Sequence, residues 1–123
     1  MAYKDKKIAV IGVSNRPEKY GFKIFRDLLK DGYDIAGVNP TAPEVLGKET
    51  YKSLKDIKGA LDLVITVVPH QVTERVVDEC SQLGIKEIWM QPGSESDDAI
   101  KKAKDLGINV THNSCFMVVN GIW

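Results

Sequence analysis

The residues best suited to chemistry in this sequence lie in one polar loop near its start. Gly12 follows an apolar run, and Gly21 opens an amphipathic segment. Between them the loop carries hydroxyl, amide and cationic side chains, namely those of Ser14, Asn15, Arg16 and Lys19. Interpreted as strand, loop and helix, this stretch directs backbone N–H groups and the positive end of a helix dipole at a bound anion. The loop therefore predicts an anion site, with a nucleotide phosphate as the favoured ligand.

A simpler interpretation of the same loop stays open, in which the two glycines only permit a tight turn and the cations are solvated. A dinucleotide-binding Rossmann loop normally has three closely spaced glycines and an acidic residue after the second strand. This chain has a longer polar loop, and Asn39 ends the second expected strand. That pattern weakens NAD as a ligand. Two cations in the loop favour a ligand with more than one phosphate group, such as coenzyme A.

Cysteine and histidine are the other residue types capable of chemistry. Cys80, Cys115, His70 and His112 lack the spacing of a metal site, so we expect no structural zinc. Neither histidine has a visible acid–base partner, so we expect no complete catalytic group. Cys80 falls on an apolar helix face and is expected in the core. Cys115 follows the last expected strand, where it is either a partly buried packing residue or a nucleophile that exchanges with a ligand thiol.

The composition predicts a single domain spanning residues 1–123. Apolar residues make up 43% of the chain and charged residues 28%, which is typical of globular proteins and excludes disorder. The 17 basic and 17 acidic residues cancel, so no global field attracts nucleic acid or an anionic membrane. We expect no membrane span and no secretion signal, which favours a cytoplasmic location with reduced thiols.

Hydrophobic patterning predicts the elements that position the loop. Apolar runs bounded by glycine, proline or asparagine predict strands at residues 8–11, 33–38, 61–68, 85–90 and 108–111. Helical spacing is found over residues 22–29 and 72–83, and again from an expected N-cap at Ser94 to Leu106. This alternation predicts an α/β fold, a single doubly wound, Rossmann-like parallel sheet of about five strands with helices on both faces. In such sheets ligands bind beyond the carboxyl ends of the strands.

Five segments together match a known family. The strings GVSNRPEKYG, GYDIAGVNP, TVVPHQV, WMQPGSES and NSCFMV begin at residues 12, 32, 66, 89 and 113. In that order they closely resemble the small stand-alone coenzyme A-binding protein family. The same fold forms the amino-terminal domain of the succinyl-CoA ligase alpha subunit. The resemblance covers nearly the whole chain.

The resemblance implies both a ligand and its contacts. The phosphates of coenzyme A or an acyl-CoA would be held by Gly12, Ser14, Asn15, Arg16, Lys19 and the helix start at Gly21. Residues beside the nucleotide and its adenine would be Asn39, Pro40, Val68, Pro69 and Val72. The pantetheine arm would be faced by Gln91, Gly93, Ser114 and Cys115.

The resemblance implies a ligand more readily than it implies a reaction. The ligase needs a second domain with a phosphorylated histidine, and we expect no such domain in this chain. We therefore expect a binding, sensing or carrier protein whose partner is coenzyme A or an acyl-CoA, without nucleic acid or membrane. The alternatives are an NAD(P)-binding oxidoreductase-like protein and an acyl-CoA-handling enzyme that uses Cys115. An oligomer or a protein partner stays open, and Ile122 and Trp123 could cover either the sheet edge or such a partner.

Overall fold

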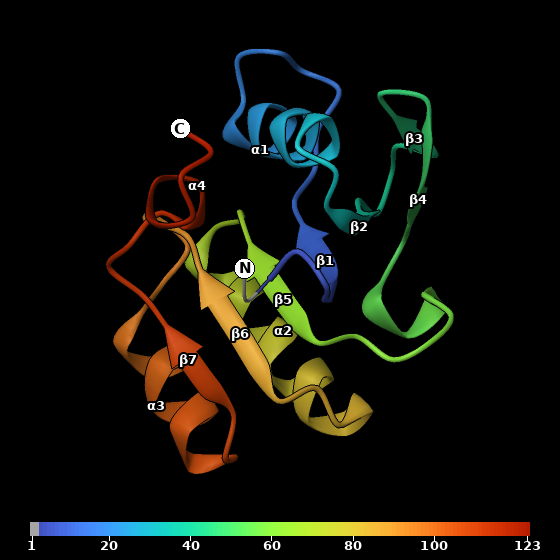
Figure 1. Cartoon of the computed structure of the whole chain (residues 1–123). Coiled ribbons are helices and arrows are strands. Elements are labelled where there is room, and N and C mark those ends of the chain that lie inside the picture. Colours follow the sequence, from blue (N-terminus) through green and yellow to red (C-terminus); the bar gives the residue numbers. More distant parts are fainter. Residues whose placement is uncertain (1–2) are drawn as a thin grey trace.

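A seven-stranded sheet forms the centre of the molecule in the computed structural model, which describes residues 3–123 (Figure 1). Its strands are β1 (Lys7–Ile11), β2 (Asp34–Val38), β3 (Glu44–Val45), β4 (Lys48–Tyr51), β5 (Leu63–Thr66), β6 (Glu87–Met90) and β7 (Asn109–Thr111). Their order in the sheet is β3-β4-β2-β1-β5-β6-β7. All neighbouring pairs are parallel except β3 and β4. The predicted α/β class is confirmed, and each of the five predicted strands is present.

The sheet is larger than the predicted five strands because β3 and β4 form an antiparallel hairpin at one edge. The hairpin lies between the strands predicted at residues 33–38 and 61–68, in a segment for which no strand was predicted. Leu46 and Gly47 connect the two strands, and both have positive φ, at 53° and 76°. This is the backbone shape of a tight hairpin turn. Both strands are short and polar, so no apolar run signalled them.

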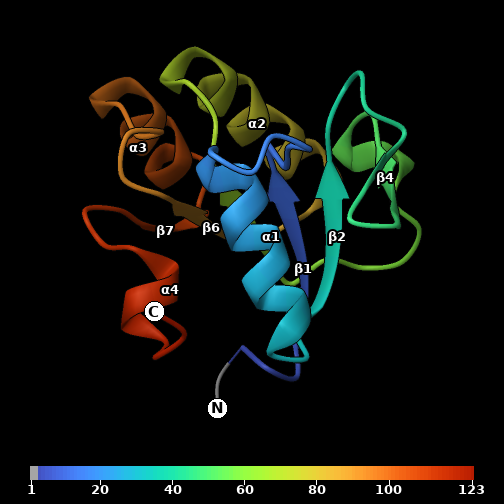
Figure 2. The ribbon, with the colours of Figure 1, turned by 90° about the horizontal axis from the view of Figure 1, so that it is seen from above.

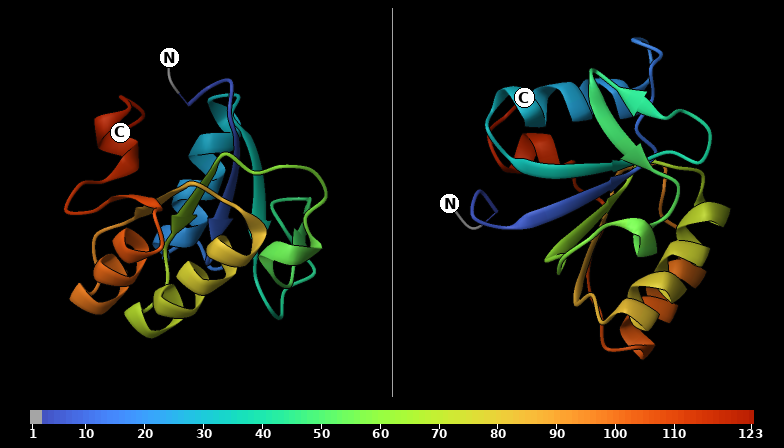
Figure 3. Two further views of the ribbon diagram at one scale, coloured as in Figure 1. Left: turned by 90° about the horizontal axis from the view of Figure 1, so that it is seen from below. Right: turned by 90° about the vertical axis from the view of Figure 1, so that its right-hand side faces the viewer.

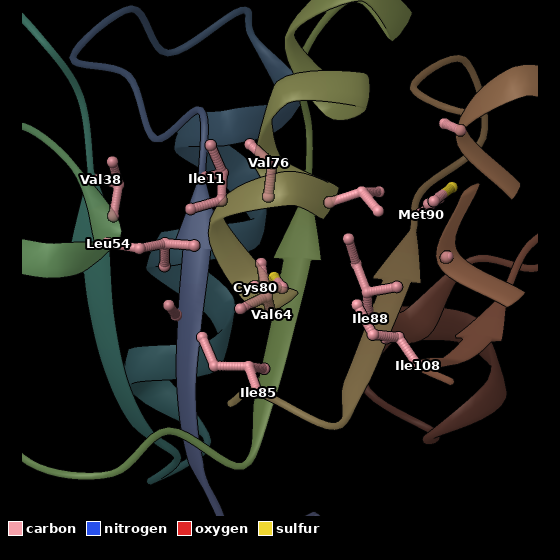
Figure 4. Close-up of a cluster of buried hydrophobic side chains, with 14 of the residues drawn as sticks. Ile11, Val38, Leu54, Val64, Val76, Cys80, Ile85, Ile88, Met90 and Ile108 are labelled. Atoms are coloured by element: carbon pink, nitrogen blue, oxygen red, sulfur yellow. The ribbon is translucent and has the colours of Figure 1, made fainter. Parts of the chain in front are cut away.

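Helices cover both faces of the sheet (Figure 2). They are α1 (Tyr20–Lys30), α2 (His70–Leu83), α3 (Asp97–Asp105) and α4 (Phe116–Val119), with a 3₁₀ turn at Leu54–Asp56. Figure 3 shows α2 and α3 together on one side of the sheet and α1 on the other. Successive residues of β1 alternate between the two resulting core clusters, because side chains along a strand point to opposite faces. Figure 4 shows the cluster beneath α2, in which Cys80 is fully buried as expected.

Two details of the predicted helices were wrong. The N-cap of α3 is Ser96, whose hydroxyl accepts a hydrogen bond from the Ala99 N–H at 3.1 Å. Ser94 is instead buried, and its hydroxyl bonds to the Thr66 and Gln91 carbonyls. The helical spacing over residues 72–83 puts Leu83 on the same apolar face as Cys80, but Leu83 is the last residue of α2 and is 46% exposed.

The strand order identifies the edge of the sheet at which a ligand site is expected. From β1 the chain passes through α1 to β2 on one side, and it later returns to β5 on the other side. The order therefore reverses between β1 and β5, and ligands bind at such a reversal, beyond the carboxyl ends of the strands. Gly12 follows β1 and Val67 follows β5 at this edge.

The start of α1 depends on a close backbone contact. A Cβ atom at Gly21 would lie 2.0 Å from the Gly12 carbonyl oxygen. We expect Gly21→Ala to lower the free energy of unfolding in urea by about 1–3 kcal/mol, because the backbone must move apart. Lys30→Ala, at an exposed position of the same helix, should change it by less than about 0.5 kcal/mol. Equal stability of the two variants would contradict this contact.

The two cysteines should differ in reactivity. Cys80 is buried, and burial raises the pKa of its thiol to about 12. Cys115 is only half-buried. A thiol-specific chromogenic reagent should therefore detect one thiol in the native protein and both thiols in urea. Native Cys115→Ser should give no rapid reaction, and a rapid reaction of that variant would show that Cys80 is accessible.

Candidate functional site

A cleft of about 680 Å³ opens at the carboxyl ends of β1, β5 and β6. The loop after β1 and the first turn of α1 contribute Gly12, Val13, Ser14, Lys19, Tyr20 and Gly21. The remaining lining residues are Asn39, Val67, Val68, Pro69, His70, Pro92, Gly93 and Ser94. The cleft thus gathers the loops after β1, β2, β5 and β6 and the starts of α1 and α2, as expected at a reversal of strand order.

Two helices begin at this cleft without a cap. Neither α1 nor α2 has a side-chain cap bond or an acidic residue in its first turn. Within residues 3–123, the N–H groups of Tyr20, Gly21, His70 and Gln71 have no hydrogen-bond partner. By contrast, α3 has the Ser96 cap and two acidic residues in its first turn. The free donors and the positive ends of both helix dipoles suit an anion in the cleft.

Glycine is required at Gly12, which lines the cleft. Gly12 has a φ of +103°, and a Cβ atom there would lie 2.3 Å from the Val67 carbonyl oxygen. Together with the contact at Gly21, this brings the loop after β1, the start of α1 and the loop after β5 against one another. A side chain at either glycine would separate the segments that carry the free N–H groups.

The polar side chains of the first loop have different partners. Ser14 Oγ accepts a hydrogen bond from the Arg16 N–H at 3.0 Å, and Asn15 Nδ2 donates to the Glu44 carbonyl at 3.0 Å. Arg16 forms an exposed ion pair with Glu18 at 2.9 Å. Of the two predicted cations, only Lys19 lines the cleft. Asn15 and Arg16 lie outside its lining.

Asn39 lines the cleft, but its amide is occupied by backbone groups. Its Nδ2 donates to the Val13 carbonyl at 2.8 Å, and its Oδ1 accepts from the N–H groups of Thr41 and Ala42, each at 2.8 Å. A carboxylate could not donate to Val13. The position therefore needs an amide, which explains why the sequence lacks an acidic residue after β2.

A second depression of about 530 Å³ lies on the other side of Gly12 and Val68, which line both hollows. The residues predicted to flank the nucleotide divide between the two. Pro69 lines the cleft, whereas Pro40 and Val72 line the second depression. Its remaining lining includes the charged side chains of Lys52, Arg75, Asp78 and Glu79.

Three of the four residues predicted to face a pantetheine arm lie outside the cleft lining, and only Gly93 is part of it. Gln91 is buried, and its Oε1 accepts the Phe116 N–H at 2.6 Å while its Nε2 lies 3.3 Å from Cys115 Sγ. The Ser114 carbonyl accepts the indole N–H of Trp89 at 2.8 Å. These contacts tie the start of α4 to β6.

Sequence reasoning missed Tyr20 and His70 as lining residues. His70 Nδ1 lies 3.3 Å from Glu74 Oε2, which also accepts the Ser96 hydroxyl at 3.0 Å. The bond from His70 is the largest of the causes that lower the pKa of Glu74. The signal for this pair was present in the sequence, because residues four apart on a helix are neighbours.

Within residues 3–123, no group of three or more histidine, cysteine, aspartate or glutamate side chains is arranged so that it could hold a metal ion. No helix in this part of the chain has the length and apolar character needed to cross a membrane.

Known proteins match the chain along nearly its whole length. A protein of Bacillus subtilis (strain 168), the uncharacterized YneT, is 30% identical over 119 residues, covering 97% of this chain and 88% of YneT. The alpha subunit of the ADP-forming acetate–CoA ligase II of Pyrococcus furiosus is 32% identical over 124 residues, covering 92% of this chain. The match spans only 27% of that ligase subunit.

Solved structures share the fold. A conserved hypothetical protein from Pyrococcus furiosus superposes with a TM-score of 0.89 at 35% identity, over 93% of this chain and 98% of that one. A hypothetical protein from Pyrococcus horikoshii OT3 gives a TM-score of 0.89 at 34% identity, over 94% of this chain and 82% of that one.

The family model of the CoA binding domain matches residues 6–121, a range that includes every residue lining the cleft. The resemblance found in the sequence motifs is thereby confirmed, and the chain belongs to the CoA-binding domain family.

Proposed function

We propose that the protein binds coenzyme A or an acyl-CoA, with the diphosphate held at the uncapped starts of α1 and α2. The main observation in its favour is that both uncapped helix starts line the same cleft. Their free N–H groups and the Lys19 ammonium would neutralise and hydrogen-bond the phosphate oxygens. Family membership and the ligase relative favour coenzyme A among nucleotides.

The two hollows would take the two ends of such a ligand. Because Gly12 and Val68 line both, one molecule with its diphosphate at Gly12 would extend into each. The adenosine would enter the second depression, where Val72 offers apolar contact and Arg75 offers a cation for the 3′-phosphate. The pantetheine arm would run through the cleft between Gly93 and the first turn of α1.

Other predicted residues would act on the site indirectly. Asn15, Asn39 and Gln91 would shape the site through their bonds to backbone groups, and Arg16 would attract the anion from the exposed side of the loop. Cys115 lies outside the cleft lining, so we assign no reaction to it and propose a binding or carrier protein. Two free thiols and a coenzyme A ligand fit a cytoplasmic protein.

Isothermal titration calorimetry should distinguish the candidate nucleotides. Coenzyme A should bind, and 3′-dephospho-coenzyme A should bind about tenfold more weakly, because a charge-assisted contact is lost. NAD, which lacks the 3′-phosphate and the pantetheine arm, should give no comparable heat. Absence of heat with coenzyme A, or equal affinity for NAD, would reject the proposal.

Lys19→Ala should raise the dissociation constant for coenzyme A about tenfold, because the ammonium faces the phosphates. Arg16→Ala removes the same charge from the same loop outside the cleft lining, and it should raise the constant only about twofold. The matched pair separates direct contact from general attraction. An unchanged constant in the double variant would contradict phosphate binding by this loop.

A further inference from the structure

We propose that Tyr20 and Trp123 form a subsite for the acyl group of an acyl-CoA, so that the protein binds apolar thioesters more tightly than free coenzyme A. This inference rests on the proposed function, because it needs the coenzyme to occupy the cleft. It adds a ligand preference and two residues that determine it.

Trp123 is held in place on the outer side of α1. Its indole N–H donates to Asp27 Oδ2 at 2.7 Å, and its backbone N–H donates to the Met117 carbonyl at 3.1 Å. The side chains of Arg26 and Trp123 both lower the pKa of Asp27, so this carboxylate remains a charged acceptor. A side chain held at both ends loses little freedom when a ligand binds against it.

Tyr20 connects this tryptophan to the cleft. The two rings lie with their centroids 6.2 Å apart and are tilted by 40°. Tyr20 is the first residue of α1 and lines the cleft. Because Tyr20 both lines the cleft and lies beside Trp123, the aromatic pair adjoins the cleft.

More than half of the exposed large hydrophobic side chains belong to α1 and to the segment from α4 onward. Among residues 3–123 seven large hydrophobic side chains are exposed, and three of them are spread over other elements. The other four lie on the first turn of α1 and on the segment from α4 onward, which is next to α1 in Figure 1, and they are Tyr20 (66% exposed), Val118 (59%), Val119 (61%) and Trp123 (43%). Such a gathering marks a binding surface more often than single exposed residues do.

An acyl group is the occupant that the geometry favours. The cleft between Tyr20 and Gly93 has apolar side chains from Val13, Val67 and Pro92 in its lining, which suits a pantetheine arm. A thioester at the end of that arm would reach the open side of the cleft, where the aromatic rings are exposed. Asp27 is paired with Arg26, so an acyl chain bound beside α1 would not have to cover an unpaired carboxylate.

The test compares the binding of coenzyme A, acetyl-CoA and octanoyl-CoA to the full chain by calorimetry. Each methylene that is fully buried on binding raises the affinity about fourfold, and a methylene on a half-open surface raises it by less. We expect octanoyl-CoA to bind about tenfold more tightly than coenzyme A, with acetyl-CoA close to coenzyme A. In Trp123→Ala the affinity for coenzyme A should stay within about twofold, and the octanoyl advantage should fall to about twofold. Leu106→Ala, an exposed apolar residue after α3, should change neither value.

Quenching of tryptophan fluorescence by acrylamide gives a second readout in the unaltered protein. Trp89 is buried and Trp123 is 43% exposed, so the quencher reports mainly on Trp123. Octanoyl-CoA should reduce quenching, and coenzyme A should not.

The outcomes separate the two proposals. If none of the three ligands binds, the proposed function fails and the subsite fails with it. If coenzyme A binds but octanoyl-CoA binds no more tightly, the subsite alone is overturned. An octanoyl advantage that survives in Trp123→Ala, with quenching unchanged by octanoyl-CoA, would also overturn it.

Discussion

The backbone contact between Gly12 and Gly21 is the constraint on which the rest of the site depends. It places the start of α1 directly against the end of β1. The Val67 carbonyl also lies close to Gly12. The starts of α1 and α2 can therefore line one cleft. A larger residue at either glycine would move the donors of one helix away from those of the other.

The N-termini of the helices differ in how their first N–H groups are capped. The N-terminus of α3 has the Ser96 cap and two acidic side chains, whereas the N-cap residues of α1 and α2, Lys19 and Pro69, make no side-chain cap bond. An anion in the cleft would supply the missing acceptors. The side-chain amides of Asn15, Asn39 and Gln91 near the cleft form hydrogen bonds with main-chain groups of neighbouring segments.

Much of this fold was predictable from the sequence, because the apolar runs of β1 and β5 and the glycine stops of the helices are strong local signals. The hairpin of β3 and β4 was not predictable in the same way, since its short polar strands depend on the edge of β2. The cap of α3 was ambiguous because two serines precede the helix, and only the structure shows that Ser94 is buried between β5 and β6.

For the site, the loop from Gly12 to Lys19 followed from residue spacing, but the directions of individual side chains did not. Cys115 and Gln91 follow strands at the correct edge, yet they point into contacts that hold α4. Conversely, Tyr20 and His70 carry no phosphate-loop signal in the sequence, and they line the cleft because they are the first residues of their helices. Chain order predicts which loops meet, whereas packing decides which side chains face the ligand.

The central claim is that the uncapped starts of α1 and α2 hold the phosphates of the coenzyme. The most direct measurement is a titration of the ¹⁵N-labelled protein with coenzyme A, followed by ¹H–¹⁵N nuclear magnetic resonance. The account predicts saturable shifts of the amide signals of Tyr20, Gly21, His70 and Gln71, with little change in the first amides of the capped helix α3. Saturable binding that leaves all of these α1 and α2 amides unshifted would contradict it.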